Sequence, residues 1–362
     1  MSKLAANLVN NCLRIRSSDN VSIFFYPHST AIAEDLATEC FRVGADAILV
    51  AYTDKFYEAY MKLLPVESLR QPSAYCRGLT ELSTAQFWVG AAYDPSVYRR
   101  IPPERMAATS EGETAAHYGP SRERKVRSLF LELGLVTRPR AKVYGFSYPV
   151  WERMLRAASA VPAKKLRTDG KKVAAILETG DHVRVTADDG TNLEFSVRGR
   201  PAFIYDGVVD DEDIASGALD ASIPAGNVSV APIESSANGT VAFNVPQPYA
   251  GRMIRKMVWE FKDGKVTSFT GDANALALRK EWDASGGDKD RIGGLSIGLN
   301  PRAKFGFLSN GLVRGAVTIG IGGNEAEGGT NKPGFFFSQS LQGATVEVDG
   351  KPILRGGKIL VA

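Results

Sequence analysis

Histidine and cysteine are scarce in this sequence of 362 residues, and neither occurs after His182. Zinc, iron and copper sites in proteins normally include imidazole or thiolate ligands. A transition metal bound by the second half would therefore have only oxygen ligands from that half. Cys12, Cys40 and Cys76 are odd in number and lack CxxC spacing, which predicts reduced thiols rather than a disulfide framework or a zinc knuckle.

Long apolar runs are also missing, since no run approaches the ~18 residues that a membrane-spanning helix needs. The first twenty residues are interrupted by Asn7, Asn10, Asn11 and Arg14, so they contain no continuous signal-peptide core. The net charge of +4 is small, and the basic cluster at 164–172 has no interleaved aromatic residues. We therefore expect a cytoplasmic protein without a membrane or nucleic-acid partner.

The first half alternates apolar runs of strand length with helical patterns, which is typical of parallel βαβ units. The predicted strands are 21–27, 45–52, 85–93 and a short one within 140–149, and the predicted helices are 3–17, 31–43, 58–64 and 122–133. This order predicts an open, mostly parallel sheet with helices on both faces.

The turn after the first predicted strand does not fit a dinucleotide site. It reads Tyr-Pro-His-Ser-Thr and lacks the GxGxxG pattern that lets a backbone approach a pyrophosphate. His28 lies at the carboxyl end of that strand, where open α/β sheets often bind ligands. An exposed loop histidine is the favoured interpretation.

The pattern changes after a helix-prone, basic stretch at 150–177 in which Pro162 and Gly170 suggest breaks. Beyond Asp181 polar and apolar residues alternate around Asp-Gly and Asn-Gly pairs, which predicts hairpins. These pairs are Asp189-Gly190, Asn238-Gly239 and Asp263-Gly264, followed by a predicted helix at 273–282 and terminal strands. We therefore expect an α/β domain with a helical linker at 1–179, and an α+β, mainly antiparallel β domain at 180–362.

The order of several motifs in the second half resembles one known family. These are DDGTNLEFSVRGR, IPAGNVSVAPIESSANGTVAF, IGLNP, GAVTIGIGGN and EVDGKPIL. They resemble the aminopeptidase T family of metallopeptidases, which includes a branch of mononuclear-iron 2,5-dihydroxypyridine dioxygenases. The resemblance implies a homodimer, and in the peptidases a pair of metals held by two glutamates, two histidines and an aspartate.

The family's metal-binding positions hold other residues in this sequence. Matched motif by motif, they carry Asn227, Gly294, Thr318, Phe336 and Ser338. The two histidines and one aspartate of the dioxygenase branch are absent as well. Neutral oxygens and phenylalanine rings are poor ligands for a dication, so we expect neither a metal nor another cofactor.

A pocket of neutral or cationic residues is the predicted ligand site. Its candidates are Asn227, Arg302, Thr318, Asn324, Asn331, Lys332, Phe336 and Ser338. In an extended strand Phe336 points away from Phe335 and Phe337, and core packing of these rings is favoured over a pocket wall. Glu234 is a weak candidate general base, with a structural carboxylate favoured. Glu325 and Glu327 are interpreted as loop charges rather than as weak Mg²⁺ or Ca²⁺ ligands.

Two functions follow from these patterns. The favoured hypothesis is a metal-free descendant that binds a peptide, an amino acid or a small aromatic ligand, as a binding protein or a repurposed enzyme. The alternative is an active metallo-aminopeptidase in which His28, His117 or His182 supplies a relocated ligand, helped by Glu234, Glu325 or Glu327. A purely structural subunit is a third possibility.

Overall fold

The computed structural model describes residues 3–361. Contacts divide the chain into two compact units, Met1–Arg156 with Gly207–Pro224 and Ala157–Asp206 with Ala225–Ala362. The sequence patterns suggest one division at residues 179 and 180 instead. The contacts group the chain differently because a segment from its middle returns to complete the sheet of the first unit.

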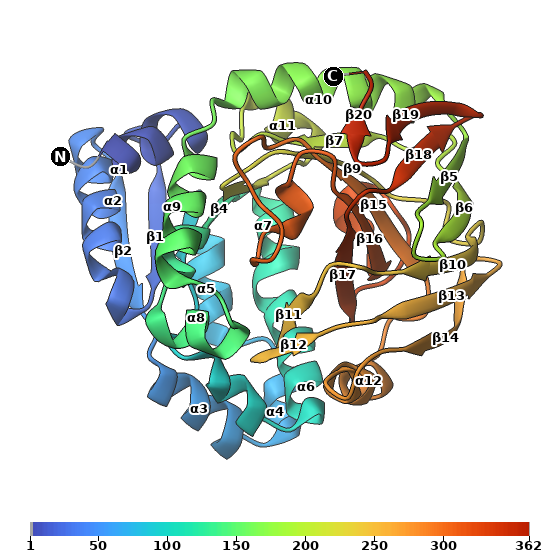
Figure 1. Ribbon diagram of the computed structural model, residues 1–362. Helices are drawn as coiled ribbons and strands as arrows, with labels where there is room; N and C mark the ends of the chain where they lie inside the picture. The colour runs from blue at the N-terminus through green and yellow to red at the C-terminus, as the bar shows by residue number, and fades with distance from the viewer. Residues whose placement is uncertain (1–2, 362) are drawn as a thin grey trace. The chain divides into compact units, whose positions relative to one another are not determined.

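The first unit contains the expected parallel sheet (Figure 1). Its strands are ordered β2-β1-β3-β4-β8, and every neighbouring pair is parallel. The strands are β1 (Asn20–Phe25), β2 (Asp46–Ala51), β3 (Ala85–Val89), β4 (Arg127–Leu131) and β8 (Asp220–Ile223). The helices are α1 (Lys3–Asn7), α2 (Thr30–Arg42), α3 (Asp54–Leu63), α4 (Val66–Arg70), α5 (Ala74–Leu82), α6 (Pro103–Glu113), α7 (Gly119–Arg124), α8 (Arg138–Tyr144) and α11 (Asp211–Ser216), and α9 (Tyr148–Ser159) continues into the second unit. Two π-helical turns, Leu8–Cys12 and Thr114–Tyr118, extend α1 and α6.

Two predictions in this unit are wrong. The expected helix at 122–133 is α7 followed by strand β4, because α7 ends at Arg124 and the next residue, Lys125, has a left-handed φ of 54°. The apolar run after it pairs with β3 on one side and β8 on the other. The expected strand within 140–149 is largely α8, whose first turn is capped by the Thr137 hydroxyl, 3.1 Å from the Arg140 amide nitrogen.

The second unit contains an antiparallel sheet of eight strands in the order β14-β13-β10-β6-β5-β18-β19-β20. The predicted hairpins at Asp189-Gly190 and Asp263-Gly264 are confirmed as β5–β6 and β13–β14. The hairpin predicted at Asn238-Gly239 is wrong, because both residues lie within β10 and pair with neighbouring strands. The strands are β5 (His182–Thr186), β6 (Asn192–Ser196), β10 (Asn238–Ala242), β13 (Val258–Lys262), β14 (Lys265–Thr270), β18 (Thr345–Val348), β19 (Lys351–Arg355) and β20 (Lys358–Ile359), with helix α12 (Ala275–Ala284) after β14. A separate hairpin joins β11 (Gln247–Tyr249) to β12 (Arg252–Ile254).

A five-stranded antiparallel sheet in the same unit carries the candidate site. Its order is β17-β16-β15-β9-β7, formed by β7 (Ala202–Tyr205), β9 (Asn227–Val230), β15 (Ile292–Gly298), β16 (Val317–Gly322) and β17 (Phe336–Leu341). Helix α10 (Ala163–Thr179) packs on β7 and β9. It continues through Gly170. A Cβ there would lie 2.6 Å from Ile204 Cγ2, so the missing side chain lets helix and strand approach. The helix covers the side of β9 that carries Val228 and leaves the opposite side for the site.

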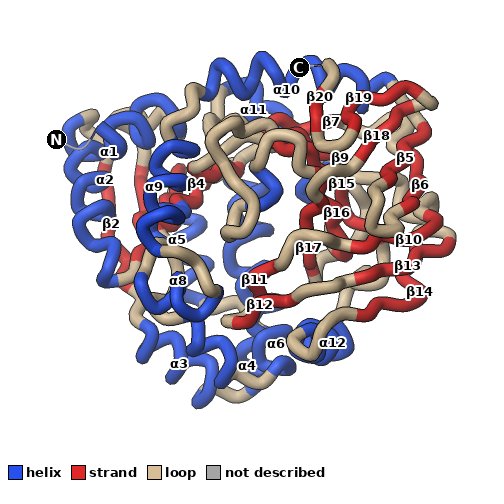
Figure 2. The backbone as a smooth tube through the Cα atoms, in the orientation of Figure 1, coloured by secondary structure: helices blue, strands red, loops and turns tan. Residues whose placement is uncertain are grey.

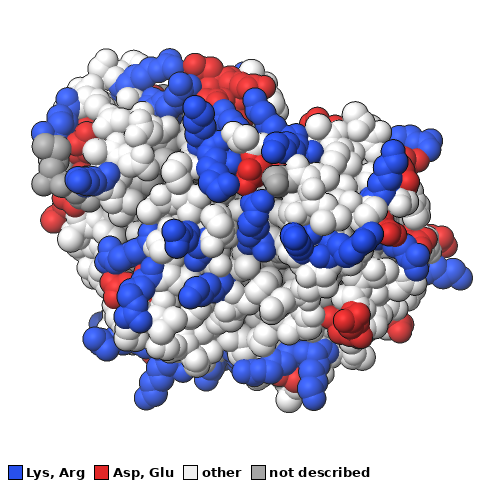
Figure 3. Space-filling view, turned by 45° about the horizontal axis from the view of Figure 1, so that its top comes forward, with Lys and Arg blue, Asp and Glu red and all other residues white. Residues whose placement is uncertain are grey.

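The described part of the chain contains no helix long and apolar enough to cross a membrane. Helix predominates over strand in the first unit, whereas strand and loop predominate in the second (Figure 2). Lys and Arg side chains are scattered over the face shown in Figure 3, among uncharged residues and smaller groups of Asp and Glu. The expected α/β and antiparallel β architectures are both confirmed.

Candidate ligand-binding site

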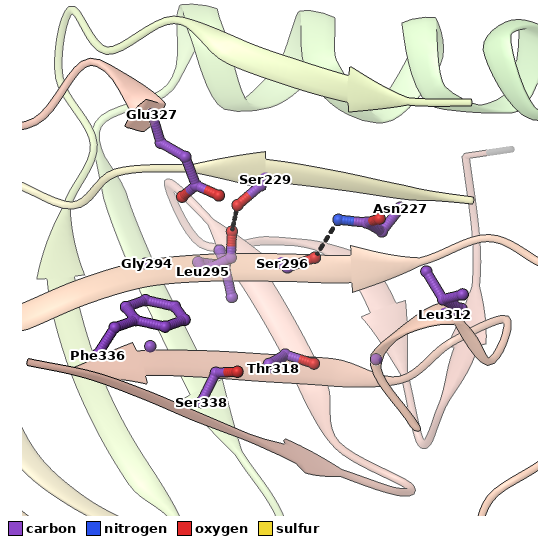
Figure 4. Close-up of a pocket in the computed structure, with 12 residues that line it drawn as sticks. Asn227, Ser229, Gly294, Leu295, Ser296, Leu312, Thr318, Glu327, Phe336 and Ser338 are labelled. Carbon is purple, nitrogen blue, oxygen red and sulfur yellow. Dashed lines mark hydrogen bonds between the residues drawn. The ribbon is translucent and has the colours of Figure 1, made fainter. Parts of the chain in front are cut away.

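Strand register gathers small polar side chains on one face of the five-stranded sheet. Ser296 of β15 lies opposite Ser229 of β9 on one side and Thr318 of β16 on the other. Side chains two residues apart in a strand lie on the same face of the sheet. The residues two positions before and after Ser229, Ser296 and Thr318 therefore lie on this face as well. Residues of this face line a cavity of about 270 Å³, shown in Figure 4. Its lining residues are Asn227, Ser229, Gly294, Leu295, Ser296, Gly311, Leu312, Thr318, Gly320, Glu327, Phe336 and Ser338.

Two paired glycines leave part of the cavity floor without side chains. Gly294 lies opposite Gly320 in the β15–β16 ladder. A Cβ on Gly320 would lie 3.2 Å from Cε2 of the Phe336 ring, and one on Gly294 would lie 3.1 Å from Glu327 Oε2. The Phe336 ring and the Glu327 carboxyl group therefore reach across space that side chains at the two glycines would occupy.

Glu327, interpreted from the sequence as a loop charge, lines the cavity, as do Ser229 and Ser296, which the sequence analysis did not single out. It ends a short 3-10 turn, Glu325–Glu327, and its carboxyl group reaches toward Ser229 in Figure 4. Burial raises the pKa of Glu327, and a hydrogen bond with the Ser229 side chain offsets this only partly. The sequence signal was the glycine at position 294, where the resemblance implies a glutamate. Because Gly294 has no side chain, the carboxyl group of Glu327 from a distant loop has room there.

The remaining polar side chains of the floor are neutral. The Asn227 side-chain nitrogen donates to the Ser296 hydroxyl at 2.9 Å, and the hydroxyls of Thr318 and Ser340 lie 2.8 Å apart. The Ser338 hydroxyl lines the cavity and has no side-chain hydrogen bond to the described residues. The floor therefore offers hydroxyl and amide groups to a ligand but a single carboxyl group.

The three consecutive phenylalanines alternate as the sequence predicts. Phe335 and Phe337 are 5% and 3% exposed, whereas Phe336 is 61% exposed and lines the cavity. Core packing therefore accounts for two rings, and the third is a wall of the site.

Four of the predicted ligand-binding residues do not line the cavity: Arg302, Asn324, Asn331 and Lys332. Asn331 is buried, and its side-chain nitrogen donates to the carbonyls of Ile292 and Gly322 at 2.8 and 2.9 Å. Asn324 accepts from the Asn331 amide at 2.8 Å. These two asparagines hold the loop that carries Glu327 against the sheet. Arg302 and Lys332 are exposed.

Glu234 does not line the cavity. Its carboxyl group binds the same loop, through Asn324 and the Thr330 amide. Burial raises its pKa, but hydrogen bonds from the Thr330 amide and the Asn324 side chain, with the Arg200 charge, outweigh burial and hold the pKa below its usual range. Its side chain also forms an ion pair with Arg200. The candidate role of Glu234 as a general base required a raised pKa, whereas these contacts lower it.

None of the three histidines lines this cavity. His182 lies 3.5 Å from Glu194 on the surface of the eight-stranded sheet. His28 and His117 belong to the first unit, where the His28 ring lies 2.8 Å from the Gly134 carbonyl and the His117 ring lies 2.9 Å from the Thr80 hydroxyl.

Comparison with known proteins matches residues 149–361 to the family model of NicX, 2,5-dihydroxypyridine 5,6-dioxygenase. The chain belongs to the NicX family. A search of curated proteins found no match. The resemblance to aminopeptidase T and its pyridine-ring dioxygenase branch, expected from the motif order, is thereby confirmed.

Two solved structures share the fold of this NicX-family chain. Wild-type AmpT from Thermus thermophilus is 17% identical, with a TM-score of 0.76 over 99% of this chain and 98% of the other. The 2,5-dihydroxypyridine dioxygenase from Pseudomonas putida KT2440 is 14% identical, with a TM-score of 0.62 over 99% and 96%.

The cavity residues do not fit a divalent transition metal. Asn227, Thr318 and Ser338 supply neutral groups, and Phe336 supplies none, which leaves Glu327 as the one anionic donor of the cavity. Zinc and iron sites combine several imidazole, thiolate or carboxylate ligands. Within residues 3–361 no three His, Cys, Asp or Glu side chains come together in a metal-binding group.

Proposed function

We propose that this NicX-family chain binds a small planar aromatic ligand with polar substituents in the cavity of the five-stranded sheet, without a resident metal. Among the expected classes of peptide, amino-acid and small aromatic ligand, the cavity favours the last. The observation that carries the proposal is the floor formed by Gly294 and Gly320 beside the exposed Phe336 ring. A flat ring can approach the glycine backbone closely while it contacts the phenyl face.

The polar side chains of the floor support the same ligand class. Ser338 can donate to a ring nitrogen or a phenolic oxygen, and the Glu327 carboxyl group can form a second hydrogen bond with the ligand. Each neutral hydrogen bond contributes about 0.5–1.5 kcal/mol, so affinity depends on several of them together with ring contact. Whether the bound molecule is also converted depends on Glu327, the single carboxyl group among the residues that line this cavity and the candidate for proton transfer there.

Calorimetry and thermal shift with chelator-treated protein test the binding. The panel contains hydroxypyridines and hydroxybenzoates, with free amino acids and dipeptides as the competing classes. We expect saturable binding of a single-ring aromatic compound and a higher melting temperature in its presence. Ser338→Ala should weaken binding about fivefold to tenfold, as expected for one lost hydrogen bond, whereas Ser235→Ala, an exposed serine of the same unit, should leave binding unchanged.

Metal analysis of the untreated protein separates this proposal from an active metallo-aminopeptidase with relocated ligands. We expect far less than one zinc, iron, manganese or cobalt per chain and no chelator-sensitive release of N-terminal residues. Stoichiometric metal would overturn the metal-free proposal. Preference for dipeptides over all aromatic compounds would overturn the ligand class alone.

We also propose a homodimer, as the family resemblance implies. Light scattering coupled to size-exclusion chromatography should give twice the chain mass of 39.0 kDa. A monomer at micromolar concentration would contradict this.

A further inference from the structure

A second cavity lies within the first unit and has no part in the proposed function. Its volume is about 560 Å³, which is within the size range of small-molecule sites. Phe25, Ala51 and Val89 are the last residues of β1, β2 and β3, and the cavity is lined by residues at and just beyond these strand ends. The carboxyl edge of a parallel sheet is where open α/β folds bind ligands.

Aromatic rings form a large part of the wall of this cavity. The members of the wall are Phe24, Phe25, Tyr26, Tyr52, Phe56, Tyr57, Tyr60, Tyr75 and Trp88. Phe24 and Trp88 stack with ring centroids 4.1 Å apart, and Tyr52 packs edge-on against Phe56 at 5.7 Å. Aromatic ring faces are negative and attract cations.

Two titratable side chains from one irregular helical segment also line the cavity. Glu113 ends α6, and His117 lies in the π-helical turn that follows. π-Helical turns within α-helices occur frequently at functional sites. Gly112 lets this segment approach α4, because a Cβ there would lie 2.2 Å from the Leu69 carbonyl oxygen.

Glu113 has no partner for its charge. No hydrogen bond or ion pair from the described residues reaches its carboxyl group, and burial alone raises its pKa. Protein atoms close to the carboxyl group raise its pKa, yet Glu113 is an exposed residue that lines the cavity, so its side chain is open to a ligand there. His117 does not supply the missing cation, since burial lowers its pKa to about 4.

We propose that this cavity binds an organic cation with an aromatic or apolar body, its ammonium group beside Glu113 and its body against the tyrosine, phenylalanine and tryptophan rings. An unpaired carboxylate beside a group of aromatic rings matches a protonated or quaternary amine in both charge and surface. A neutral aromatic compound would fill the space but leave the carboxylate without a counter-charge, and an aromatic acid would place two negative charges together.

The test uses the full chain and three ligands of similar shape: phenethylammonium, 2-phenylethanol and 3-phenylpropionate. Binding is followed by calorimetry and by the fluorescence change of Trp88, with Trp88→Phe identifying the signal of that residue. We expect phenethylammonium to bind at least tenfold more tightly than the alcohol, and no binding of the acid.

Glu113→Gln preserves shape and removes the charge, so it should reduce the affinity for phenethylammonium at least tenfold and leave the alcohol unaffected. Glu104→Gln, at an exposed position in the first turn of the same helix, is the matched control and should bind as the unaltered chain does. The proposal is overturned if Glu113→Gln binds the cation unchanged, if the alcohol binds as tightly as the amine, or if neither binds at millimolar concentration. Loss of binding at the first site through Ser338→Ala would leave this result unaltered, so the two proposals fail separately.

Discussion

The Glu327 carboxyl group should make the chain less stable as the pH rises. Burial raises its pKa in the folded state, whereas in the unfolded chain a glutamate titrates at about 4.3. The folded state therefore binds the proton more tightly, so the stabilisation is complete below the unfolded pKa. It is lost as the pH rises to the folded pKa. Each unit of difference between the two pKa values corresponds to about 1.4 kcal/mol.

Glu327→Gln keeps the shape of the side chain and abolishes its titration. Glu325→Gln is the matched control, because Glu325 belongs to the same 3-10 turn, is exposed and does not line the cavity. We expect the two variants to be equally stable near pH 4. Near pH 8 the Glu327 variant should be more stable, by about 1.4 kcal/mol for each unit of the shift.

Urea unfolding at half-unit steps from pH 4 to pH 8 measures this difference. Comparison of the two variants cancels the pH dependence that other buried carboxyl groups, such as Glu113 and Glu281, contribute to both. Transitions observed by fluorescence and by circular dichroism must coincide, since two units can unfold separately. Parallel stability curves for the two variants would refute the placement of Glu327 in a desolvated site.

Three further predictions concern the sheets around the candidate site. Phe337→Ala should lower the free energy of unfolding in urea by about 3–5 kcal/mol, as for buried aromatic residues. Phe336→Ala should lower it much less, because Phe336 is 61% exposed, and should mainly reduce the affinity for aromatic ligands. Equal losses of stability would contradict the strand register. Gly264→Ala should lower the melting temperature well beyond Gly190→Ala. Both turn glycines have positive φ, but a Cβ at Gly264 would lie 1.7 Å from a carbonyl oxygen, whereas nothing lies within 4 Å at Gly190; similar shifts would refute the clash. Asn331→Ala should destabilise the second unit by about 1–3 kcal/mol for each of its two buried carbonyl partners left unsatisfied, measured by urea unfolding, and no change would show that water replaces the amide.

The sequence predicts the elements whose signals are local. The Asp-Gly pairs at 189–190 and 263–264 specify hairpins by turn chemistry, and both form. The alternation around Phe336 follows from the strand period alone. Strand β4 was missed because its helical-looking run becomes a strand through pairing with β3 and with β8, a four-residue segment far along the chain. Local propensity does not reveal such a partner.

In the candidate site, too, residues with a local sequence signal were predicted and those placed by distant contacts were not. Asn227, Thr318, Phe336 and Ser338 were predicted because each lies on a strand of recognisable motif order, and all four line the cavity, while their binding of a ligand stays a prediction. Glu327 was interpreted as a loop charge because its place in the cavity depends on the space above Gly294, which a local pattern does not reveal. The buried asparagines of that loop were predicted as ligand contacts because sequence does not distinguish an amide that binds a ligand from one that satisfies backbone carbonyls.

The return of strand β8 to the first unit has a consequence for how the chain is made. The backbone passes between the two units three times, and the parallel sheet lacks its edge strand until residue 223 has been synthesised. By then the ribosome has already produced α10 and the β5–β6 hairpin of the other unit. The first unit therefore cannot complete its sheet before much of the second unit has been synthesised. A truncation after residue 156 would leave β4 with an unpaired edge, which promotes aggregation. An expression fragment of this unit needs residues 207–224 joined to it by a designed linker.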